Sequence, residues 1–190
     1  MTEPTPRTPS AGGPPHPGSA SGTTAEYAAQ LIARLGDRDP IRYLEELPGA
    51  VRALVVRVDP EILRIPEAPD KWSVKDVLVH LLDSEVVYGY RMRFIVAQPE
   101  GQIAGYDQER WLRALRYREA QVDPALEALT ALRHWNLTWI RTLGDEEKAR
   151  WGTHSERGVE SVGHLIRLLA AHDMVHRTQI KRILTAVQAA

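Results

Sequence analysis

The chain has 190 residues, a length that favours a single domain with a substantial core. Its 24 lysine and arginine residues balance 25 aspartate and glutamate residues, which argues against nucleic acid or an anionic membrane as a partner. The sequence contains no cysteine, which excludes disulfides, thiolate metal sites and a cysteine nucleophile. Because it shows neither a signal peptide nor a membrane-spanning apolar run, we expect a cytoplasmic protein.

Residues 1–22 are rich in proline, glycine and serine and offer almost nothing to bury. We expect a disordered tail here, because burial cannot offset the conformational entropy of such a segment. The domain is expected to span residues 23–190, where the apolar spacing is helical and no convincing alternating strand occurs.

The first helices are delimited by recognisable start and stop signals. Residues 23–36 predict a short helix that ends at its final glycine. A second helix is expected over residues 39–58, interrupted by Pro48, because proline lacks the N–H that a helix interior uses. The strongest start signal is "DKWSVKDV", in which Ser73 is the expected N-cap of a helix over residues 74–96.

A turn-rich break separates these helices from three others. We expect helices over residues 106–117, 123–143 and 159–187, with residues 144–158 as a loop that holds at most one helical turn. The sequence therefore predicts an all-α fold, a four-helix bundle with short additional helices.

Two histidines interrupt the apolar stripe of the last helix. His172 and His176 lie one turn apart, and Gln179 follows on the same face. Two neutral imidazoles at this spacing can bind one metal ion, although hydrogen-bonded core histidines are the alternative. The segment "HDMVH" resembles the zincin motif H-E-x-x-H, but no Asp, Glu or His follows it to provide the downstream third ligand of those enzymes.

The helix over residues 74–96 offers a third histidine. His80 projects on one stripe with Ser84, Tyr88 and Arg91, close to the apolar face. Alone, it would more often be a core histidine with a hydrogen-bond partner. Because bundles build metal sites from side chains on facing helices, His80 can complete a triad with the two histidines of the last helix.

Three motifs carry a resemblance to a known family. "KWSVKDVLVHLLDSE", "YDQERW" and "ERGVESVGHLIRLLAAHDMVHRTQI" resemble, in this order, the DinB/YfiT-like superfamily of metalloenzymes, from about residue 40 to the end. The resemblance implies a bundle of DinB/YfiT type, often dimeric, that holds a divalent metal through His80, His172 and His176. Characterised relatives include bacillithiol transferases and mycothiol-dependent isomerases.

The expected activity follows from three protein ligands, which leave a coordination position for water or substrate. Nitrogen ligands suit Zn or Ni, and also Fe or Mn. We expect a thiol-dependent S-transferase of the bacillithiol or mycothiol type, in which a low-molecular-weight thiol is a cosubstrate and the substrate is a small molecule. The alternatives are a hydrolase that uses metal-bound hydroxide and a non-catalytic stress-response binding module. A homodimer is the expected assembly.

Further side chains are candidates for the reaction itself. Asp83 and Gln179 are the candidate catalytic residues, as a base or as a hydrogen-bond partner of a ligand histidine or of bound water. Arg91, Tyr88 and His154 are the candidate substrate-binding residues, with Arg91 suited to a carboxylate. Ordinary explanations are a solvated helix face for Asp83, a salt bridge for Arg91 and an exposed loop position for His154.

Other polar and aromatic residues receive structural interpretations. Asp173 projects away from the histidine face, so a salt bridge within the bundle is expected. Tyr106 and Trp111 are expected to anchor the short helix. Asn136 is either a satisfied core amide or a residue facing the site.

Overall fold

The computed structural model describes residues 23–189, so the expected tail over residues 1–22 lies outside the described residues. In chain order the elements are α1 (Thr24–Leu35), α2 (Pro40–Val55), η1 (Ile62–Arg64), α3 (Val74–Ala97), β1 (Gln102–Ile103), α4 (Gln108–Ala114), η2 (Tyr117–Glu119), α5 (Val122–Ile140), α6 (Asp145–Ala149), β2 (Trp151–His154), β3 (Gly158–Ser161) and α7 (Val162–Gln188). Here η marks a short 3₁₀ helix. The predicted helical bundle is confirmed.

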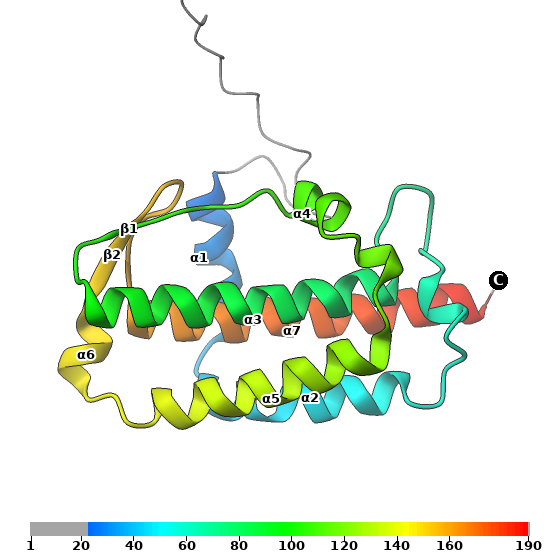
Figure 1. The fold of residues 1–190 in the computed structure, drawn as a ribbon, viewed down its shortest axis with the longest axis horizontal. Coiled ribbons are helices and arrows are strands. Elements are labelled where there is room, and N and C mark those ends of the chain that lie inside the picture. Colours follow the sequence, from blue (N-terminus) through cyan, green and yellow to red (C-terminus); the bar gives the residue numbers. More distant parts are fainter. Residues whose placement is uncertain (1–22, 190) are drawn as a thin grey trace, which may run out of the picture.

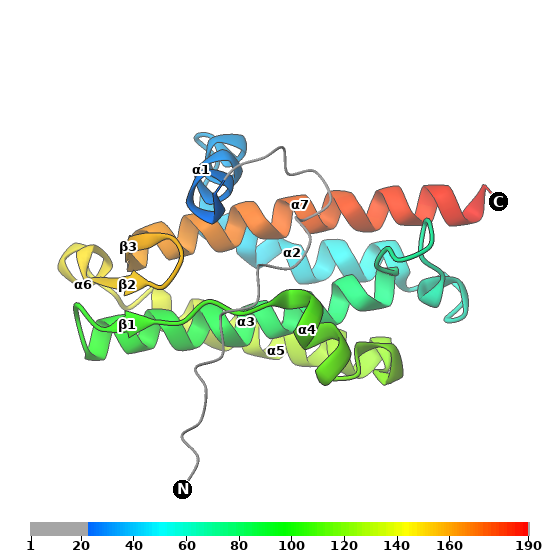
Figure 2. The ribbon, with the colours of Figure 1, turned by 90° about the horizontal axis from the view of Figure 1, so that it is seen from above.

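Four long helices, α2, α3, α5 and α7, build the bundle (Figure 1). Helix α3 packs against both α5 and α7, and α2 packs against α7 and α5 on the opposite side. Helix α1 lies across α7, while α4 covers α3 and the small sheet lies at one end of the bundle (Figure 2). Among the described helices, none combines the length and the apolar character that a membrane crossing requires.

Local capping fixes where the two site-bearing helices begin. Ser73 caps α3 by accepting from the Asp76 backbone N–H at 3.2 Å, while the Asp76 carboxylate accepts from the Ser73 N–H at 2.9 Å. This reciprocal capping box is the one expected from the sequence. Helix α7 also begins at a serine N-cap, because Ser161 accepts from the backbone N–H of His164 at 3.1 Å, but without a reciprocal bond.

The expected interruption at Pro48 is wrong, because α2 runs through this residue from Pro40 to Val55. A proline at position 48 has no N–H for the carbonyl of Leu44, four residues earlier. In the folded chain Arg133 of α5 donates to that carbonyl from Nη1 at 2.8 Å. A side chain from another helix thus replaces the missing backbone donor.

A three-stranded sheet is the feature that the sequence did not predict. Strand β2 pairs in parallel with β1 and in antiparallel register with β3. The last helix therefore starts at Val162 rather than at residue 159, because residues 158–161 belong to β3. Strands of two to four residues are too short for an alternating pattern to emerge, and β1 finds its partner about 50 residues away along the chain.

Smaller differences concern helix ends. The expected helix over residues 106–117 is the shorter α4, followed by η2, with the left-handed residue Arg116 (φ 55°) between them. Helix α5 ends at Ile140 rather than at residue 143.

Two large apolar clusters fill the bundle, one toward each end, and polar side chains separate them; a third, smaller cluster joins α3 to α4, η2 and α5. On α7 the first cluster reaches Ala171 and the second begins at Ile180. On α3 the boundary falls between Leu81 and Tyr88. The buried polar residues of the two segments between these boundaries are Ser84, Glu85, His172, Asp173, His176 and Gln179. The core is therefore divided by a polar layer at mid-bundle.

Candidate metal centre

Three histidine rings meet at this polar layer. His80 comes from α3, and His172 and His176 come from α7. Their ring centroids lie 5.0, 4.8 and 4.3 Å apart, and one possible ligand nitrogen from each lies within 4.8 Å of the others. The exposed fractions are 0% for His80, 9% for His172 and 8% for His176. The two helices thus bring together the three residues that the sequence selected.

The surroundings of the two α7 histidines indicate which ring nitrogen of each faces the centre. His176 Nδ1 donates to Oε1 of Gln179 at 2.8 Å, so the ring lone pair lies on Nε2. His172 Nδ1 lies 3.6 Å from Oδ1 of Asp173, and its Nε2 lies 3.0 Å from Nε2 of His80. His176 is thus held by a hydrogen bond of the kind that orients metal-ligating histidines, whereas the Asp173 carboxylate lies close to His172 without forming a hydrogen bond to it.

The donor set fits a divalent transition metal. Zinc–histidine bonds of about 2.0–2.1 Å place tetrahedral ligand atoms about 3.4 Å from one another. The observed separations, from 3.0 Å between His80 and His172 up to 4.8 Å, bracket this value. Three neutral imidazoles leave a position for another ligand and suit zinc, nickel, iron or manganese. The buried cluster is therefore a divalent-metal site by its chemistry.

Aromatic and hydroxyl side chains surround the three histidines. The Trp72 ring stands edge-on to His80 at 5.0 Å and parallel to His176 at 6.3 Å. Its indole N–H donates to the Glu109 carboxylate of α4 at 2.7 Å, which ties the covering helix to the site. Ser84 Oγ lies 3.4 Å from His80 Nε2. The histidine cluster is therefore bordered by an apolar indole ring at Trp72 and by a hydroxyl group at Ser84.

Tyr106 is a site residue that sequence reasoning treated only as a helix anchor. It does pack on Trp111, with ring centroids 4.4 Å apart, but its hydroxyl lies 3.4 Å from Ser84 Oγ. A chain of polar atoms thus leads from Tyr106 through Ser84 to His80. Burial raises the Tyr106 pKa, so the hydroxyl stays protonated and can donate. The motif "YDQERW" was the available signal.

Gln179 and Asp83, the two candidate catalytic residues, occupy different positions. Gln179 contacts the ligand histidine His176, as described above. Asp83 Oδ2 accepts from the hydroxyl of Tyr117 at 2.5 Å, where α3 meets η2. Burial raises the Asp83 pKa and the tyrosine hydrogen bond opposes this shift. The catalytic roles of both residues remain predictions.

The candidate substrate-binding residues lie on the opposite side of His172 from Gln179. The Tyr88 ring lies 6.3 Å from the ring of His172, and Arg91 Cζ lies 5.7 Å from the Tyr88 ring. His154 is in β2 and only 2% exposed, so the exposed-loop explanation does not apply. Their binding role remains a prediction, taken up below.

Arg133 is a buried charged residue that the sequence analysis missed. Nε donates to Glu85 at 2.7 Å and Nη2 to Asp173 at 2.8 Å, so this residue joins α3 and α7 to α5. Asp173 thus makes the bundle salt bridge that we expected. Asn136 donates to Glu85 at 2.7 Å and is a satisfied core amide. The available signal was spacing, because Arg133 follows the inward residue Leu129 by four positions.

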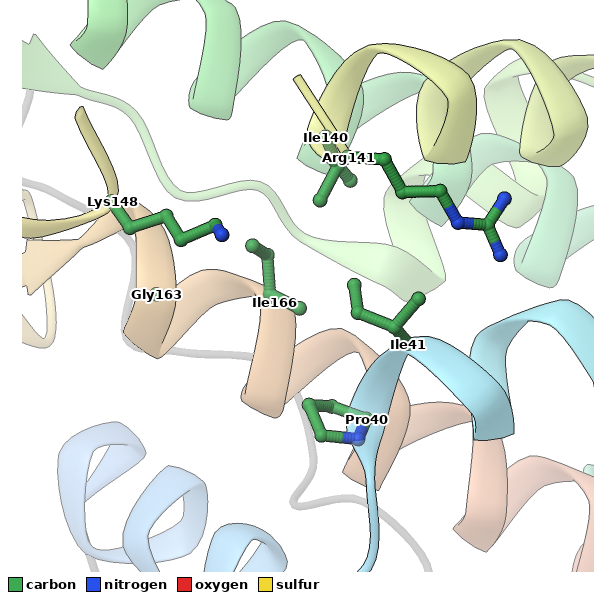
Figure 3. A pocket seen from close by; sticks show the side chains of 7 residues that line it. All are labelled: Pro40, Ile41, Ile140, Arg141, Lys148, Gly163 and Ile166. Carbon is green, nitrogen blue, oxygen red and sulfur yellow. The ribbon is translucent and has the colours of Figure 1, made fainter. Parts of the chain in front are cut away.

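A separate hollow of about 380 Å³ lies where α2, α5 and α7 meet (Figure 3). Its lining residues are Pro40, Ile41, Ile140, Arg141, Lys148, Gly163 and Ile166. The wall is mainly aliphatic and includes none of the three histidines. This hollow is therefore distinct from the metal centre.

The fold and the three-histidine site together define a helical-bundle metalloprotein. Residues 43–180 match the model of the DinB superfamily, and the chain belongs to that superfamily. The resemblance inferred from the three motifs is confirmed.

Individual relatives agree with this assignment. A protein from Oceanobacillus iheyensis, provisionally named a metal-dependent hydrolase, is 26% identical over 140 residues, which cover 74% of this chain and 81% of the relative. A Bacillus cereus protein with the same provisional name is 28% identical over 142 residues, covering 74% and 80%. The structure of YfiT from Bacillus subtilis superposes with a TM-score of 0.71 at 21% identity, covering 87% of this chain and 90% of YfiT. YfiT is described as a probable metal-dependent hydrolase with an unusual four-helix bundle topology. This similarity confirms the fold.

Proposed function

We propose that this protein is a divalent-metal-dependent enzyme that transfers a low-molecular-weight thiol to a small electrophilic substrate. The observation that carries the proposal is the convergence of His80, His172 and His176, with candidate ligand atoms within 4.8 Å of one another in a buried layer. Three protein ligands leave room for an exogenous ligand, as catalytic sites require.

A bound metal would supply a lowered pKa for a coordinated thiol, which makes a nucleophile at neutral pH. The chain has no cysteine, so the thiol must enter as a cosubstrate. In the transfer, the sulfur forms a bond to the electrophilic carbon as the leaving group departs with the bonding electrons. A thiol deprotonated on coordination needs no separate base, whereas a water nucleophile gains from one.

The protein's own side chains have defined parts in this proposal. Gln179 keeps the Nε2 lone pair of His176 directed at the centre through its 2.8 Å hydrogen bond. The Tyr106 hydroxyl, linked through Ser84 to His80, is a donor for a departing anion. Asp83, whose pKa is raised by burial, is proposed as the base for the hydrolytic alternative, in which a water nucleophile gains from one.

Metal-dependent hydrolysis is the second candidate, and the provisional names of the Oceanobacillus and Bacillus relatives favour it. The same histidines would serve, with water in place of the thiol. A non-catalytic binding module would follow if the histidines took up no metal. We also propose a homodimer and a cytoplasmic location, which light scattering and cell fractionation would test.

The test begins with the metal content of tag-free protein by elemental mass spectrometry. We expect about one equivalent of a transition metal in the wild type, with loss in folded His80→Ala and His172→Ala. His134→Ala is the matched control, because this histidine is exposed on α5 away from the cluster. No uptake of zinc or nickel by the wild type would contradict the metal site.

Activity assays then separate the two reactions. The metal-loaded protein is incubated with an electrophile, such as a chlorinated nitrobenzene, with and without a small thiol, and with ester substrates in the absence of thiol. Consumption of the electrophile only with thiol supports transfer. Ester cleavage without thiol would overturn transfer in favour of hydrolysis.

A further inference from the structure

Arg91 carries a buried charge for which the described chain supplies no carboxylate contact. Its side chain is 3% exposed, and Nη2 donates to the carbonyl of Ala104. No carboxylate oxygen of the described residues lies within 4.0 Å of this guanidinium. By contrast, the similarly buried Arg133 contacts two carboxylates. A buried guanidinium without a counter-ion is costly, which suggests that a ligand completes the site.

His154 adds a buried hydrogen-bond donor without a partner. Its Nδ1 accepts from the backbone N–H of Glu156 at 3.1 Å, so the ring proton lies on Nε2. Nε2 is fully buried and has no hydrogen-bond partner in the described part of the chain. Burial, with added repulsion from Arg157 and Arg91, lowers the His154 pKa to about 4, so the ring is a neutral donor at neutral pH.

The small sheet explains why these two side chains share one place. His154 of β2 faces Ile103 of β1 in parallel register, and the next residue, Ala104, accepts from Arg91. The sheet lies at the end of the bundle where α3 ends (Figure 1), and through these contacts it brings the imidazole and the guanidinium near each other.

The groups here that are not exposed sum to one positive charge, because Glu156, the other carboxylate near Arg157, is exposed to solvent. Arg157 also lies near His154, but Glu160 neutralises it through two contacts, of 2.6 and 2.8 Å. Arg91 therefore supplies the net charge. Burial keeps the hydroxyl of Tyr88 protonated by raising its pKa, so it is a further donor rather than an anion.

We infer that Arg91, His154 and Tyr88, here called the arginine–histidine subsite, bind a carboxylate group of the substrate or thiol cosubstrate. One carboxylate matches the single net positive charge, whereas a phosphate dianion would leave a negative charge buried. An Arg fork and neutral N–H and O–H donors are complementary to carboxylate oxygens.

The inference rests on the proposed function, because a carboxylate bound in the subsite would position the rest of the substrate near the three histidines. The Tyr88 ring connects the subsite with the histidine cluster, because it lies 6.3 Å from the His172 ring and 5.7 Å from Arg91 Cζ. Tyr106 forms a second link, since its ring lies 5.9 Å from Arg91 Cζ and its hydroxyl reaches Ser84 beside His80. The reactive carbon or sulfur would thus lie a few bonds from the anchoring carboxylate.

The test uses acetate as the probe and its neutral isostere acetamide as the control. Zinc-loaded protein with ¹⁵N-labelled histidine is titrated at millimolar probe, and the Nε2 signal of His154 is identified by its absence in His154→Phe. We expect a saturable shift with acetate, none with acetamide, and affinity weaker by about tenfold or more in Arg91→Gln. Arg93→Gln is the matched control, because Arg93 is also on α3 and also donates to a backbone carbonyl, that of Gly89.

Two further measurements cover the cases in which Arg91→Gln does not fold or acetate binds directly to zinc. If Arg91→Gln does not fold, Arg91→Lys and His154→Phe are compared by the rise in melting temperature that acetate produces, which should be reduced in both. Repeating the titration in metal-free His80→Ala separates this subsite from direct binding of acetate to zinc, and the shift should persist there.

The results also distinguish the two proposals. Zinc uptake without a saturable acetate shift would overturn the carboxylate subsite and leave the metal enzyme standing. An acetate shift that depends on Arg91 in a protein that binds no metal would support the subsite and overturn the metal enzyme.

Discussion

Replacing Arg133 by leucine is expected to destabilise the bundle by about 3–5 kcal/mol, the usual cost of removing one partner from a buried ion pair. The Glu85 and Asp173 side chains are each 1% exposed, and both would lose their cation. The carbonyl of Leu44 would lose its donor as well. Leucine provides apolar volume but cannot satisfy any of these three groups.

The assay is urea denaturation of the metal-free protein, followed by circular dichroism and compared at equal m-values. Arg141→Leu is the matched control, because Arg141 also joins two helices through a glutamate, Glu45, at 3.0 Å, but with side-chain exposures of 45% and 59%. Exposed pairs contribute only about 0–1 kcal/mol. Equal losses in the two variants would refute the view that burial makes the Arg133 network essential.

The same network predicts coupling between Arg133 and Pro48. In Pro48→Ala the helix recovers the backbone N–H that can bond the carbonyl of Leu44. Arg133→Leu should therefore cost about 1 kcal/mol less in the Pro48→Ala background, the value of one hydrogen bond to a buried carbonyl. A strictly additive double-mutant cycle would show that Arg133 does not compensate for the proline.

Three other predictions concern packing, titration and metal affinity. Gly89→Ala should destabilise the protein by about 1–3 kcal/mol, because a Cβ there would lie 2.7 Å from the Asn136 amide. Gly49→Ala should stabilise it by about 0.5–1 kcal/mol, because this helical position has open space around it. Melting temperatures that change in the same direction in both variants would contradict this prediction. The pKa of His154 is about 4 in the folded protein, against 6.5 for an ordinary histidine. As the pH falls, the unfolded chain therefore binds a proton at this residue before the folded protein does. The free energy of unfolding should therefore decrease between about pH 6.5 and 4, by up to about 3 kcal/mol. In His154→Asn, which keeps an acceptor for the Glu156 N–H, that decrease should be smaller, and an unchanged pH profile would be evidence against a buried neutral imidazole. Asp173→Asn should lower zinc affinity by about 10–100-fold in a chelator competition, because the carboxylate lies behind a ligand histidine, and unchanged affinity would rule out this orienting role.

Local sequence patterns determined the helices and the ligand set. Ser73 and its capping partner set the start of α3, and helical periodicity placed His80, His172 and His176 on inward stripes. These signals act over one or two helical turns, so a single chain displays them without knowledge of its fold. Helix ends were less well defined where a strand directly precedes the helix, as β3 does at the start of α7.

Only the tertiary structure decided the features that depend on partners far apart in the chain. Strand β1 becomes a strand because residues 153 and 154 pair with it, and Pro48 is accommodated in α2 because Arg133 reaches its orphaned carbonyl. The polar surroundings of Arg91 likewise arise from a loop and a sheet that fold back over α3. A short strand or a lone buried charge has no period of its own, and its conformation is stable only once another segment supplies the missing hydrogen bonds and counter-charges.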